Sequence, residues 1–316
     1  MSEALTRANH TFRTNESIDS QMGVRVRKAR QQKRLKAAIE KSRSVREPKF
    51  AKYILRSGTR MRLEDWDPEA KSGFDRKKQQ GLRELGVLTE RLEVLQGLLY
   101  AEHKHSLMVV LQGMDASGKD GTIRRVFEGV NPQGVRVAKF GPPTPEELDH
   151  DFLWREHQKT PATGEIVIFN RSHYEGVLVE RVHKLVPKEV WKSRFGQINN
   201  FERLLVESGT IVLKFYLNIS ASEQKRRLQE RLEDPTKNWK FSVRDLPERG
   251  LWDEYMKAYE EALEKTSTDS APWFIVPSNH AWFRDLVVCT VIVESLESLR
   301  MRYPRLPKDE ESLKVK

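Results

Sequence analysis

Five short segments of the chain consist mainly of apolar residues and show no regular alternation with polar positions. Each is too short for a typical helix, and such runs are typical of strands that are buried on both faces of a sheet. The predicted strands are 107–111, 135–140, 166–169, 211–217 and 273–276.

The stretches between these strands have apolar residues three or four positions apart. This spacing predicts helices at 122–128, 146–158, 188–207 and 222–232, and six leucines with the same spacing predict another helix at 81–100. Strands that alternate with helices form parallel sheets covered on both faces. The expected fold class is therefore α/β, a three-layer α/β/α domain with a mostly parallel five-stranded sheet.

One segment, 233–265, interrupts this alternation just before the last strand. It is rich in charged residues and tryptophan, and it is where a mobile lid could sit. Its aromatic residues Trp239, Phe241 and Trp252 are expected either to seat such a lid or to pack in a small core of its own.

The composition narrows the class of protein. The longest apolar stretch, Leu286 to Val293, has eight residues, whereas about 20 are needed to cross a bilayer. The start of the chain lacks the charged-then-apolar pattern of a secretory signal. The single cysteine, Cys289, excludes an intramolecular disulfide and is expected to be a small buried residue. We expect a soluble, cytoplasmic protein with no membrane partner.

A glycine-rich loop directly follows the first predicted strand. Gly113-Met-Asp-Ala-Ser-Gly118-Lys119 has the G-x-x-x-x-G-K spacing of a phosphate-binding loop. The glycines allow a tight turn with inward N–H groups, the following helix adds the positive end of its dipole, and Lys119 adds a full charge. The predicted phosphate-binding residues are Gly113, Ala116, Ser117, Gly118, Lys119, Asp120, Gly121 and Thr122.

Two acidic residues distinguish this loop from the usual pattern. Asp120 stands where a Ser or Thr normally ligates Mg²⁺, and Asp115 lies inside the loop. Carboxylates beside a phosphate site are unfavourable unless a cation lies between them and the phosphate. Asp115 is therefore a candidate Mg²⁺ ligand or a base near the accepting oxygen, and the alternative is that it caps a turn.

The predicted strand 166–169 ends in Asn170-Arg-Ser-His-Tyr-Glu175. In phosphate-loop kinases, a strand at this place usually delivers an Asp to the metal. Because Asn170 is neutral, Glu175 becomes the next candidate metal ligand, and Arg171 is expected to point at the transferred phosphoryl group. The alternative is a surface loop with incidental charges.

These segments resemble the polyphosphate kinase 2 family. The resemblance runs from about Tyr53 to Leu299 and is carried, in order, by LMVVLQGMDASGKDGT, IFNRSHYEGVLVERVH, FERLL, LKFYL, EQKRRLQERL, WKF and APWF. The subgroup resembled most is class III, in which the second strand ends in Phe-Asn-Arg-Ser-His-Tyr-Glu rather than Phe-Asp-Arg-Ser-Trp-Tyr-Asn.

The resemblance implies a P-loop kinase-type fold with a helical lid. It also implies reversible phosphoryl transfer between inorganic polyphosphate and adenine nucleotides, from AMP to ADP and from ADP to ATP, with guanine nucleotides as further candidates. The cofactor implied is Mg²⁺, with Mn²⁺ as a substitute, and the assembly implied is a homo-oligomer, either a dimer or a tetramer.

Several residues match family positions. Asp115 and Lys119 match the loop acid and the loop lysine, and Arg171 matches the arginine after the second strand, so these three are the predicted catalytic residues. Tyr174 and Glu175 are the expected acceptor-side residues, with Asp115 and Glu175 as metal ligands. Arg231 matches an arginine at the lid base that contacts the phosphate chain. Class III members usually have Asp where this chain has Gly176, which bears on metal affinity and on AMP use.

A polyphosphate chain offers only negative charge, so a protein must hold it in a groove of cations, for which Arg is well suited. The candidate groove cations are Arg155, Arg226, Arg227, Arg231, Lys237 and Lys240. The alternative for each of them is a solvated charge on a helix surface.

The net charge of +10 lies mostly at the start of the chain. Residues 1–50 carry 13 Lys and Arg against 5 Asp and Glu, whereas the remaining residues are nearly neutral. This region is predicted to be either a solvated extension or an anion-binding tail that contacts polyphosphate, nucleic acid or another subunit. The predicted organisation is an extension at 1–50, a kinase domain at 51–300 with its lid at 233–265, and a charged tail at 301–316.

Three other functions remain open from the sequence. The first is a polyphosphate kinase restricted to nucleoside diphosphates, and the second is a nucleotide kinase that uses ATP as donor. The third is a basic-armed module that binds nucleic acid or a nucleoside triphosphate. The near-neutral body and the lack of a recognised nucleic-acid motif argue against nucleic acid as a partner.

Overall fold

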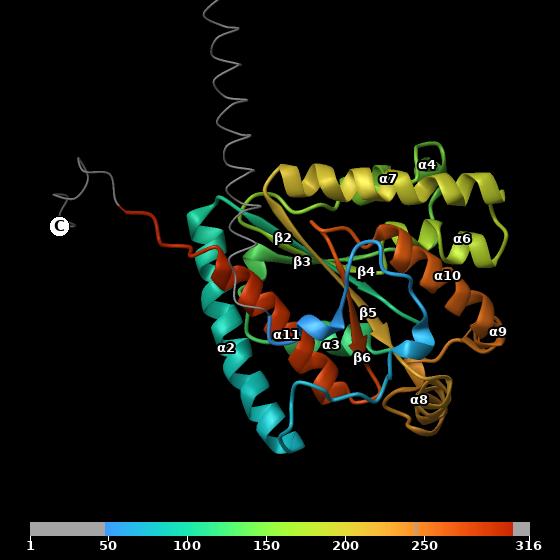
Figure 1. Cartoon of the computed structure of the whole chain (residues 1–316), viewed down its shortest axis with the longest axis horizontal. Helices are drawn as coiled ribbons and strands as arrows, with labels where there is room; N and C mark the ends of the chain where they lie inside the picture. Colours follow the sequence, from blue (N-terminus) through green and yellow to red (C-terminus); the bar gives the residue numbers. More distant parts are fainter. Residues whose placement is uncertain (1–47, 244, 306–316) are drawn as a thin grey trace, which may run out of the picture. The chain divides into compact units, whose positions relative to one another are not determined.

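The computed structural model describes residues 48–243 and 245–305. Most of the predicted basic extension and of the predicted C-terminal tail lies outside these residues. The sheet has six strands in the order β1-β6-β5-β2-β4-β3 (Figure 1). The strands are β1 (Ile54–Leu55), β2 (Ser106–Gln112), β3 (Val135–Lys139), β4 (Ile166–Asn170), β5 (Thr210–Asn218) and β6 (Trp273–Pro277).

All five predicted strands are confirmed, and they run parallel to one another. The sixth strand, β1, pairs antiparallel with the edge strand β6. The sheet is therefore one strand larger than predicted. Two residues are too few to show a periodic pattern, so β1 could not be predicted from the sequence.

Helices cover both faces of the sheet (Figure 1). One face packs against α2 (Lys78–Glu102), α3 (Lys119–Val126) and α11 (Ala281–Ser298). The other face packs against α6 (Val179–Val182), α7 (Lys188–Glu207) and α10 (Trp252–Thr266). The remaining α-helices are α4 (Pro145–Leu148), α5 (Trp154–His157), α8 (Ala221–Glu233) and α9 (Asp245–Gly250). Short 3₁₀ turns lie at Ala51–Tyr53, Leu63–Asp65, Pro132–Gly134, His173–Gly176 and Asn238–Lys240.

The central strand β2 shows why the strands lack alternating polarity. Leu107, Val109 and Leu111 point into the core on the α2 and α11 side, whereas Met108 and Val110 point into the core on the α7 and α10 side. All seven residues of β2 are buried. The three-layer α/β/α architecture predicted from the sequence is confirmed.

The second half of the predicted lid belongs to the body. Helix α10 buries Tyr255, Ala258, Tyr259, Ala262 and Leu263, each at most 6% exposed, in the core beside α7. These positions have helical spacing, but the many charged residues between them hide it in the sequence. The part of the predicted lid that reaches the cleft described below is confined to residues 237–245.

Two further expectations can be compared with the structure. The predicted helix 146–158 is two short helices, α4 and α5, separated by residues 149–153. Cys289 is free and buried, as predicted.

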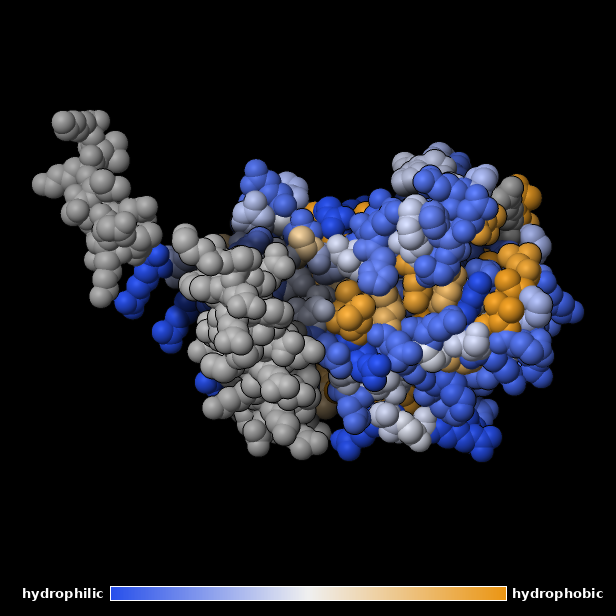
Figure 2. Space-filling view, turned by 90° about the horizontal axis from the view of Figure 1, so that it is seen from above, coloured by the Kyte–Doolittle hydropathy of each residue, from blue (hydrophilic) through white to orange (hydrophobic). Residues whose placement is uncertain are grey.

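None of the described helices is both long and apolar enough to span a membrane. Even α11, whose buried residues are mostly apolar, also buries Arg284 and Asp285. The face of the molecule on the side of α7 is mostly hydrophilic, with hydrophobic residues in separate patches (Figure 2).

Candidate active site

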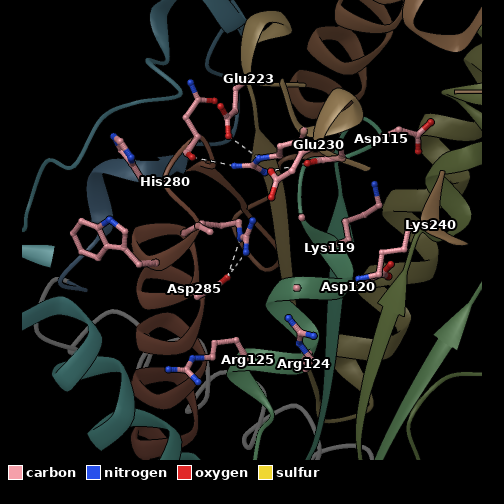
Figure 3. Close-up of a pocket in the computed structure, with 18 of the residues that line it drawn as sticks. Asp115, Lys119, Asp120, Arg124, Arg125, Glu223, Glu230, Lys240, His280 and Asp285 are labelled. Carbon is pink, nitrogen blue, oxygen red and sulfur yellow. Dashed lines mark hydrogen bonds and ion pairs between the residues drawn. The ribbon is translucent and has the colours of Figure 1, made fainter. Parts of the chain in front are cut away.

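The loops after β2 and β4 and the N-terminal ends of α8 and α11 meet in a cleft of about 1720 Å³. This is the carboxyl edge of a parallel sheet, where open α/β folds bind their ligands. Fifteen of the lining residues are Lys or Arg and seven are Asp or Glu. Figure 3 shows that Asp115, Lys119 and Asp120 come from the loop and start of α3, Glu223 and Glu230 from α8, and His280 and Asp285 from α11. A cleft of this charge is suited to a polyanionic ligand.

Both glycines of the phosphate loop are required by its geometry. Gly113 and Gly118 have φ angles of 148° and 109°, which favour glycine. A Cβ at Gly113 would lie 2.8 Å from the Leu217 carbonyl oxygen, and one at Gly118 would lie 1.8 Å from a guanidinium nitrogen of Arg284. Gly118 is the N-cap residue of α3, so the loop leads directly into the first free N–H groups of this helix.

Lys119 folds back onto the loop that precedes it. Its Nζ donates to the carbonyl oxygens of Gly113 at 2.6 Å and Met114 at 3.2 Å. Burial lowers the pKa of this ammonium to about 8, although the neighbouring Asp115 acts in the opposite direction. A bound phosphate would stabilise the charged form.

Arg171 lies between two of the predicted carboxylates. It pairs with Asp115 at 3.0 Å and with Glu175 at 3.9 Å. Burial acts to lower the pKa of Arg171, but Glu175 and Asp115 outweigh burial and raise it. Arg171 thus places a cation directly beside Asp115, and a carboxylate near a phosphate site is unfavourable without one. The structure brings Asp115, Lys119, Arg171 and Glu175 together, as the motifs predict.

The carboxyl group of Glu175 contacts Gln112 as well as Arg171. It accepts a hydrogen bond from Gln112 Nε2 at 3.2 Å. Burial raises the pKa of Glu175, and the nearby Arg171 opposes this effect. Glu175 is not among the residues that line the cleft, so it reaches the cleft through Arg171.

The two unusual residues of the motifs compensate each other. Asn170 Nδ2 donates to Asp120 Oδ1 at 2.6 Å. Asp120 stands where Ser or Thr is usual, and Asn170 stands where Asp is usual. An Asp at position 170 would place two carboxylates in contact, whereas the Asn amide can donate. The neutral residue therefore fits the acidic one.

Tyr174, predicted on the acceptor side, lies in the core. It is 1% exposed, and its hydroxyl donates to Glu202 on α7 at 2.8 Å. His173 contacts the same Glu202 carboxylate at 3.2 Å, and Lys214 on β5 donates to it at 2.6 Å. Lys214 also donates to the Tyr174 hydroxyl and to the Thr266 carbonyl oxygen. Tyr174 thus anchors the loop after β4 in the core and does not line the cleft.

Two predicted phosphate ligands have side chains turned away from the cleft. Thr122 is fully buried, its hydroxyl donates to Asp285 and its N–H donates to Gly118 within α3. Thr122 therefore has no donor left for phosphate. Ser117 is also fully buried, and its N–H donates to the Met114 carbonyl oxygen.

Of the six candidate groove cations, five line the cleft and one does not. Arg155 lies outside the cleft lining and pairs with Glu147 and Glu156, so the prediction for Arg155 is wrong. The other five candidates do line the cleft. Arg231 on α8 lies 3.5 Å from Asp245 at the start of α9. The guanidinium of Arg227 donates to four backbone carbonyl oxygens.

Sequence reasoning missed a second, aromatic and basic wall of the cleft. It includes Trp282 at the start of α11, which packs edge-on against Phe74 with ring centroids 5.7 Å apart. Lys71, Arg76, Lys77 and Lys78 lie on the same wall. Also missed were Arg284 and Asp285, a buried ion pair at 2.8 Å. Two charged residues at the head of the long apolar run of α11 were the available signal.

The oxygen donors available to a metal ion are few. Among residues 48–243 and 245–305, no group of three or more His, Cys, Asp and Glu side chains is placed to hold a metal. Mg²⁺ in phosphoryl-transfer sites usually takes one or two carboxylates, with phosphate oxygens and water as its other ligands. Asp115, whose side chain is 27% exposed and lines the cleft, has the donor chemistry that fits this arrangement.

Comparison with known proteins agrees with these features. The family model described as Polyphosphate kinase 2 (PPK2) matches residues 75–304. The chain is 56% identical over 254 residues to the AMP/ADP-polyphosphate phosphotransferase of Meiothermus ruber, which covers 80% of this chain and 95% of that protein. It is 42% identical over 268 residues to the ADP-polyphosphate phosphotransferase of Rhodopseudomonas palustris, and this match covers 81% of this chain and 92% of that protein.

A solved structure gives the same result. The crystal structure of Polyphosphate Kinase 2 from Arthrobacter aurescens TC1 matches with a TM-score of 0.78 at 42% sequence identity, over 83% of this chain and 92% of that chain. Fold, motifs and sequence identity therefore agree. The chain belongs to the polyphosphate kinase 2 family.

Proposed function

We propose that this protein catalyses reversible phosphoryl transfer between inorganic polyphosphate and adenine nucleotides, from AMP to ADP and from ADP to ATP. One observation carries the proposal. The phosphate loop and the Asp115–Arg171–Glu175 cluster lie in a cationic cleft of a chain that is 56% identical to an AMP/ADP-polyphosphate phosphotransferase.

The residues of the cleft account for binding and alignment. The N–H groups at the start of α3 and the Lys119 ammonium bind the terminal phosphate of one substrate. Arg171 faces the developing charge on the transferred group, since phosphoryl transfer depends mainly on alignment and charge stabilisation. The accepting phosphate oxygen is ionised near neutral pH, because its pKa is about 6. Asp115 is therefore not needed as a base, and its contact with Arg171 fixes that guanidinium instead.

We further propose that Mg²⁺ takes part, held from the protein side by Asp115, with Mn²⁺ as a substitute. When bound, the ion would neutralise charge between donor and acceptor phosphates. Asp115 would then serve both the ion and Arg171 through its two carboxylate oxygens, only one of which pairs with Arg171 at 3.0 Å.

Use of AMP as well as ADP rests on the relative from Meiothermus ruber, whose name includes both acceptors. The alternative, a kinase restricted to diphosphates, is favoured by Gly176. A Cβ at this position would lie 2.8 Å from a guanidinium nitrogen of Arg194 and 3.1 Å from the ring of Phe152. The Asp usual in class III thus needs Arg194 to move, so the region next to Glu175 differs from that pattern.

The test uses purified protein with AMP or ADP, polyphosphate and Mg²⁺, followed by chromatography of the nucleotides. We expect ADP and ATP from AMP, and no products when Mg²⁺ is removed by a chelator. If polyphosphate phosphorylates ADP but not AMP, the acceptors are restricted to diphosphates. Phosphorylation of AMP by ATP, with no reaction from polyphosphate, would contradict the proposal and identify a nucleotide kinase.

We also propose a cytoplasmic location, where adenine nucleotides are available, and a dimeric or tetrameric assembly. Light scattering of the full chain tests the assembly. A monomer at the concentration used in the assay would contradict it.

A further inference from the structure

The carbonyl groups of residues 113–117 in the phosphate loop all accept hydrogen bonds from side chains. Arg227 on α8 donates to the Ala116 and Ser117 oxygens at 3.0 and 3.1 Å. Gln224, also on α8, donates to the Asp115 oxygen at 3.1 Å, and Arg284 on α11 donates to the Ser117 oxygen at 3.2 Å. Lys119 takes the oxygens of Gly113 and Met114. Every carbonyl from Gly113 to Ser117 therefore has a side-chain donor.

Arg227 has no N–H group left for a ligand. A guanidinium has five donors. Those of Arg227 go to Glu223, to the Ala116 and Ser117 oxygens, and to the Ser278 and Asn279 oxygens at 2.6 and 3.0 Å. The neighbouring Arg226 differs, because its side chain is 61% exposed and its partners are Glu223 and Glu230 on its own helix. Two adjacent arginines thus line one cleft with different roles.

Arg284 ties the loop to α11. It is 3% exposed and pairs with Asp285, whose Oδ1 also accepts a hydrogen bond from Thr122 on α3. The dashed lines at Asp285 in Figure 3 mark the Arg284 contacts. The loop and the helix that follows it are therefore fixed to α11 as well as to α8.

Holding the carbonyls determines where the amides point. In a trans peptide the N–H group points away from the C=O group of the preceding residue. Because the Asp115 and Ser117 oxygens are bound to α8 and α11, the N–H groups of Ala116 and Gly118 face the opposite side. Preorganised donors of this kind need no rearrangement when an anion binds.

We infer that Arg227, Arg284 and Gln224 are positioning residues that hold the phosphate loop in its anion-binding conformation, and that Arg227 is not itself a phosphate ligand. This inference rests on the proposed function in that the ligand of the loop is a phosphate group. Gln224 also accepts a hydrogen bond from Arg249 on α9 at 2.8 Å, so the helix after the lid segment reaches the loop through the same side chain.

The test is a charge-neutral substitution, Gln224→Met, with Gln229→Met as the matched control on the same helix. Gln229 bonds to the exposed Glu233 and does not line the cleft. Affinity for inorganic tripolyphosphate is measured by calorimetry without nucleotide, together with kcat and Tm. We expect Gln224→Met to bind tripolyphosphate about tenfold more weakly and Gln229→Met to match the wild type.

A second variant, Arg227→Lys, keeps the charge but cannot supply five donors in a fixed plane. We expect it to lose affinity by about a hundredfold, whereas Arg203→Lys, at an exposed arginine of α7 outside the cleft lining, keeps affinity within about threefold. Wild-type tripolyphosphate affinity in both Gln224→Met and Arg227→Lys, even with a lowered Tm, would overturn the inference. A wild-type protein that binds tripolyphosphate but transfers no phosphate would contradict the proposed function alone.

Discussion

The loops after β2 and β4 begin side by side, since Leu111 pairs with Asn170 in the sheet, yet they are held in different ways. The phosphate loop, residues 113–119, is held by its backbone carbonyls through side chains of α8 and α11. The acceptor loop, residues 170–176, is held by its own side chains, because His173 and Tyr174 enter the core and bind Glu202.

The difference follows from what each loop offers the substrates. In the phosphate loop, Met114 packs in the core, but the residues from Asp115 to Gly118 have short side chains, and the carbonyls of Asp115, Ala116 and Ser117 are held by side chains of α8 and α11. The acceptor loop lines the cleft with Arg171, which Glu175 contacts from outside the lining, and His173 and Tyr174 between them serve as anchors. Arg171 has a φ of 64°, an uncommon value for a residue other than glycine, which is consistent with a loop held in place by these anchors.

The anchor of the acceptor loop includes a buried ion pair. Lys214 and Glu202 have side chains that are 0% and 1% exposed. Burial lowers the pKa of Lys214, and Glu202 opposes this shift. Burial alone would raise the pKa of Glu202, but Lys214 and His173 hold it below its ordinary value. Removing one partner of such a pair is much more costly than removing a solvated charge.

The largest expected effect is on the phosphate loop. Lys119→Ala should lower kcat/KM for transfer by about a thousandfold or more, because it removes the only positive charge of the loop, residues 113–119. The Tm should change little, since the buried ammonium is disfavoured by desolvation. Lys104→Ala, at an exposed residue paired with Glu102, is the control. Turnover above about a tenth of the wild-type rate would contradict a catalytic role for Lys119.

A substitution in the anchor of the acceptor loop should lower stability strongly, whereas Lys119→Ala should lower activity and leave stability nearly unchanged. Lys214→Met should lower the free energy of unfolding by about 3–5 kcal/mol, because it leaves the Glu202 carboxylate buried without its cation. Denaturant unfolding measures this change. The double variant Lys214→Met, Glu202→Leu should recover much of the stability, since it removes both charges.

Activity should not recover in that double variant, because His173 and Tyr174 have lost their shared acceptor. We expect kcat to stay about tenfold below the wild type. Full recovery of both stability and kcat would show that the ion pair has no part in positioning Arg171 and Glu175.

The phosphate loop could be predicted because its signal is local. The spacing of Gly113, Gly118 and Lys119 after a buried strand is enough to define the loop. The strands were predictable for a similar reason, since each is a short apolar run between helices. The pairing of Asn170 with Asp120 could not be predicted from either motif alone, because it depends on the contact between two loops.

The supports of both loops come from distant parts of the chain. Arg284 contacts the carbonyl of Ser117, 167 residues away, and Lys214 contacts Tyr174, 40 residues away. The sequence shows each as a charged residue in an apolar segment, which signals a buried partner but does not identify it. The positioning role inferred for Arg227 could not be predicted either, because its hydrogen bonds to Glu223 and to four backbone carbonyls depend on the tertiary structure.

A smaller effect should separate the two acceptors. Glu175→Asn removes the carboxylate near Arg171 and shortens the side chain by one methylene group. We expect KM for AMP to rise about tenfold and KM for ADP to rise less than about threefold, since the family resemblance links this position to acceptor choice. Steady-state assays with each acceptor measure the ratio. Equal changes for AMP and ADP would contradict a role in acceptor choice.

The smallest effect is a loss of activity at alkaline pH that only the phosphate loop should cause. The Lys119 pKa is lowered from 10.5 to about 8, so the free protein loses this ammonium as the pH rises through 8. Arg171, whose pKa is raised, stays charged. kcat/KM, which reports the free enzyme, should therefore be level just below pH 8 and fall by about tenfold per unit well above it. kcat at saturation should stay level to higher pH, because bound phosphate stabilises the ammonium. A kcat/KM that is level up to pH 10 would show that Lys119 keeps its proton in the free protein.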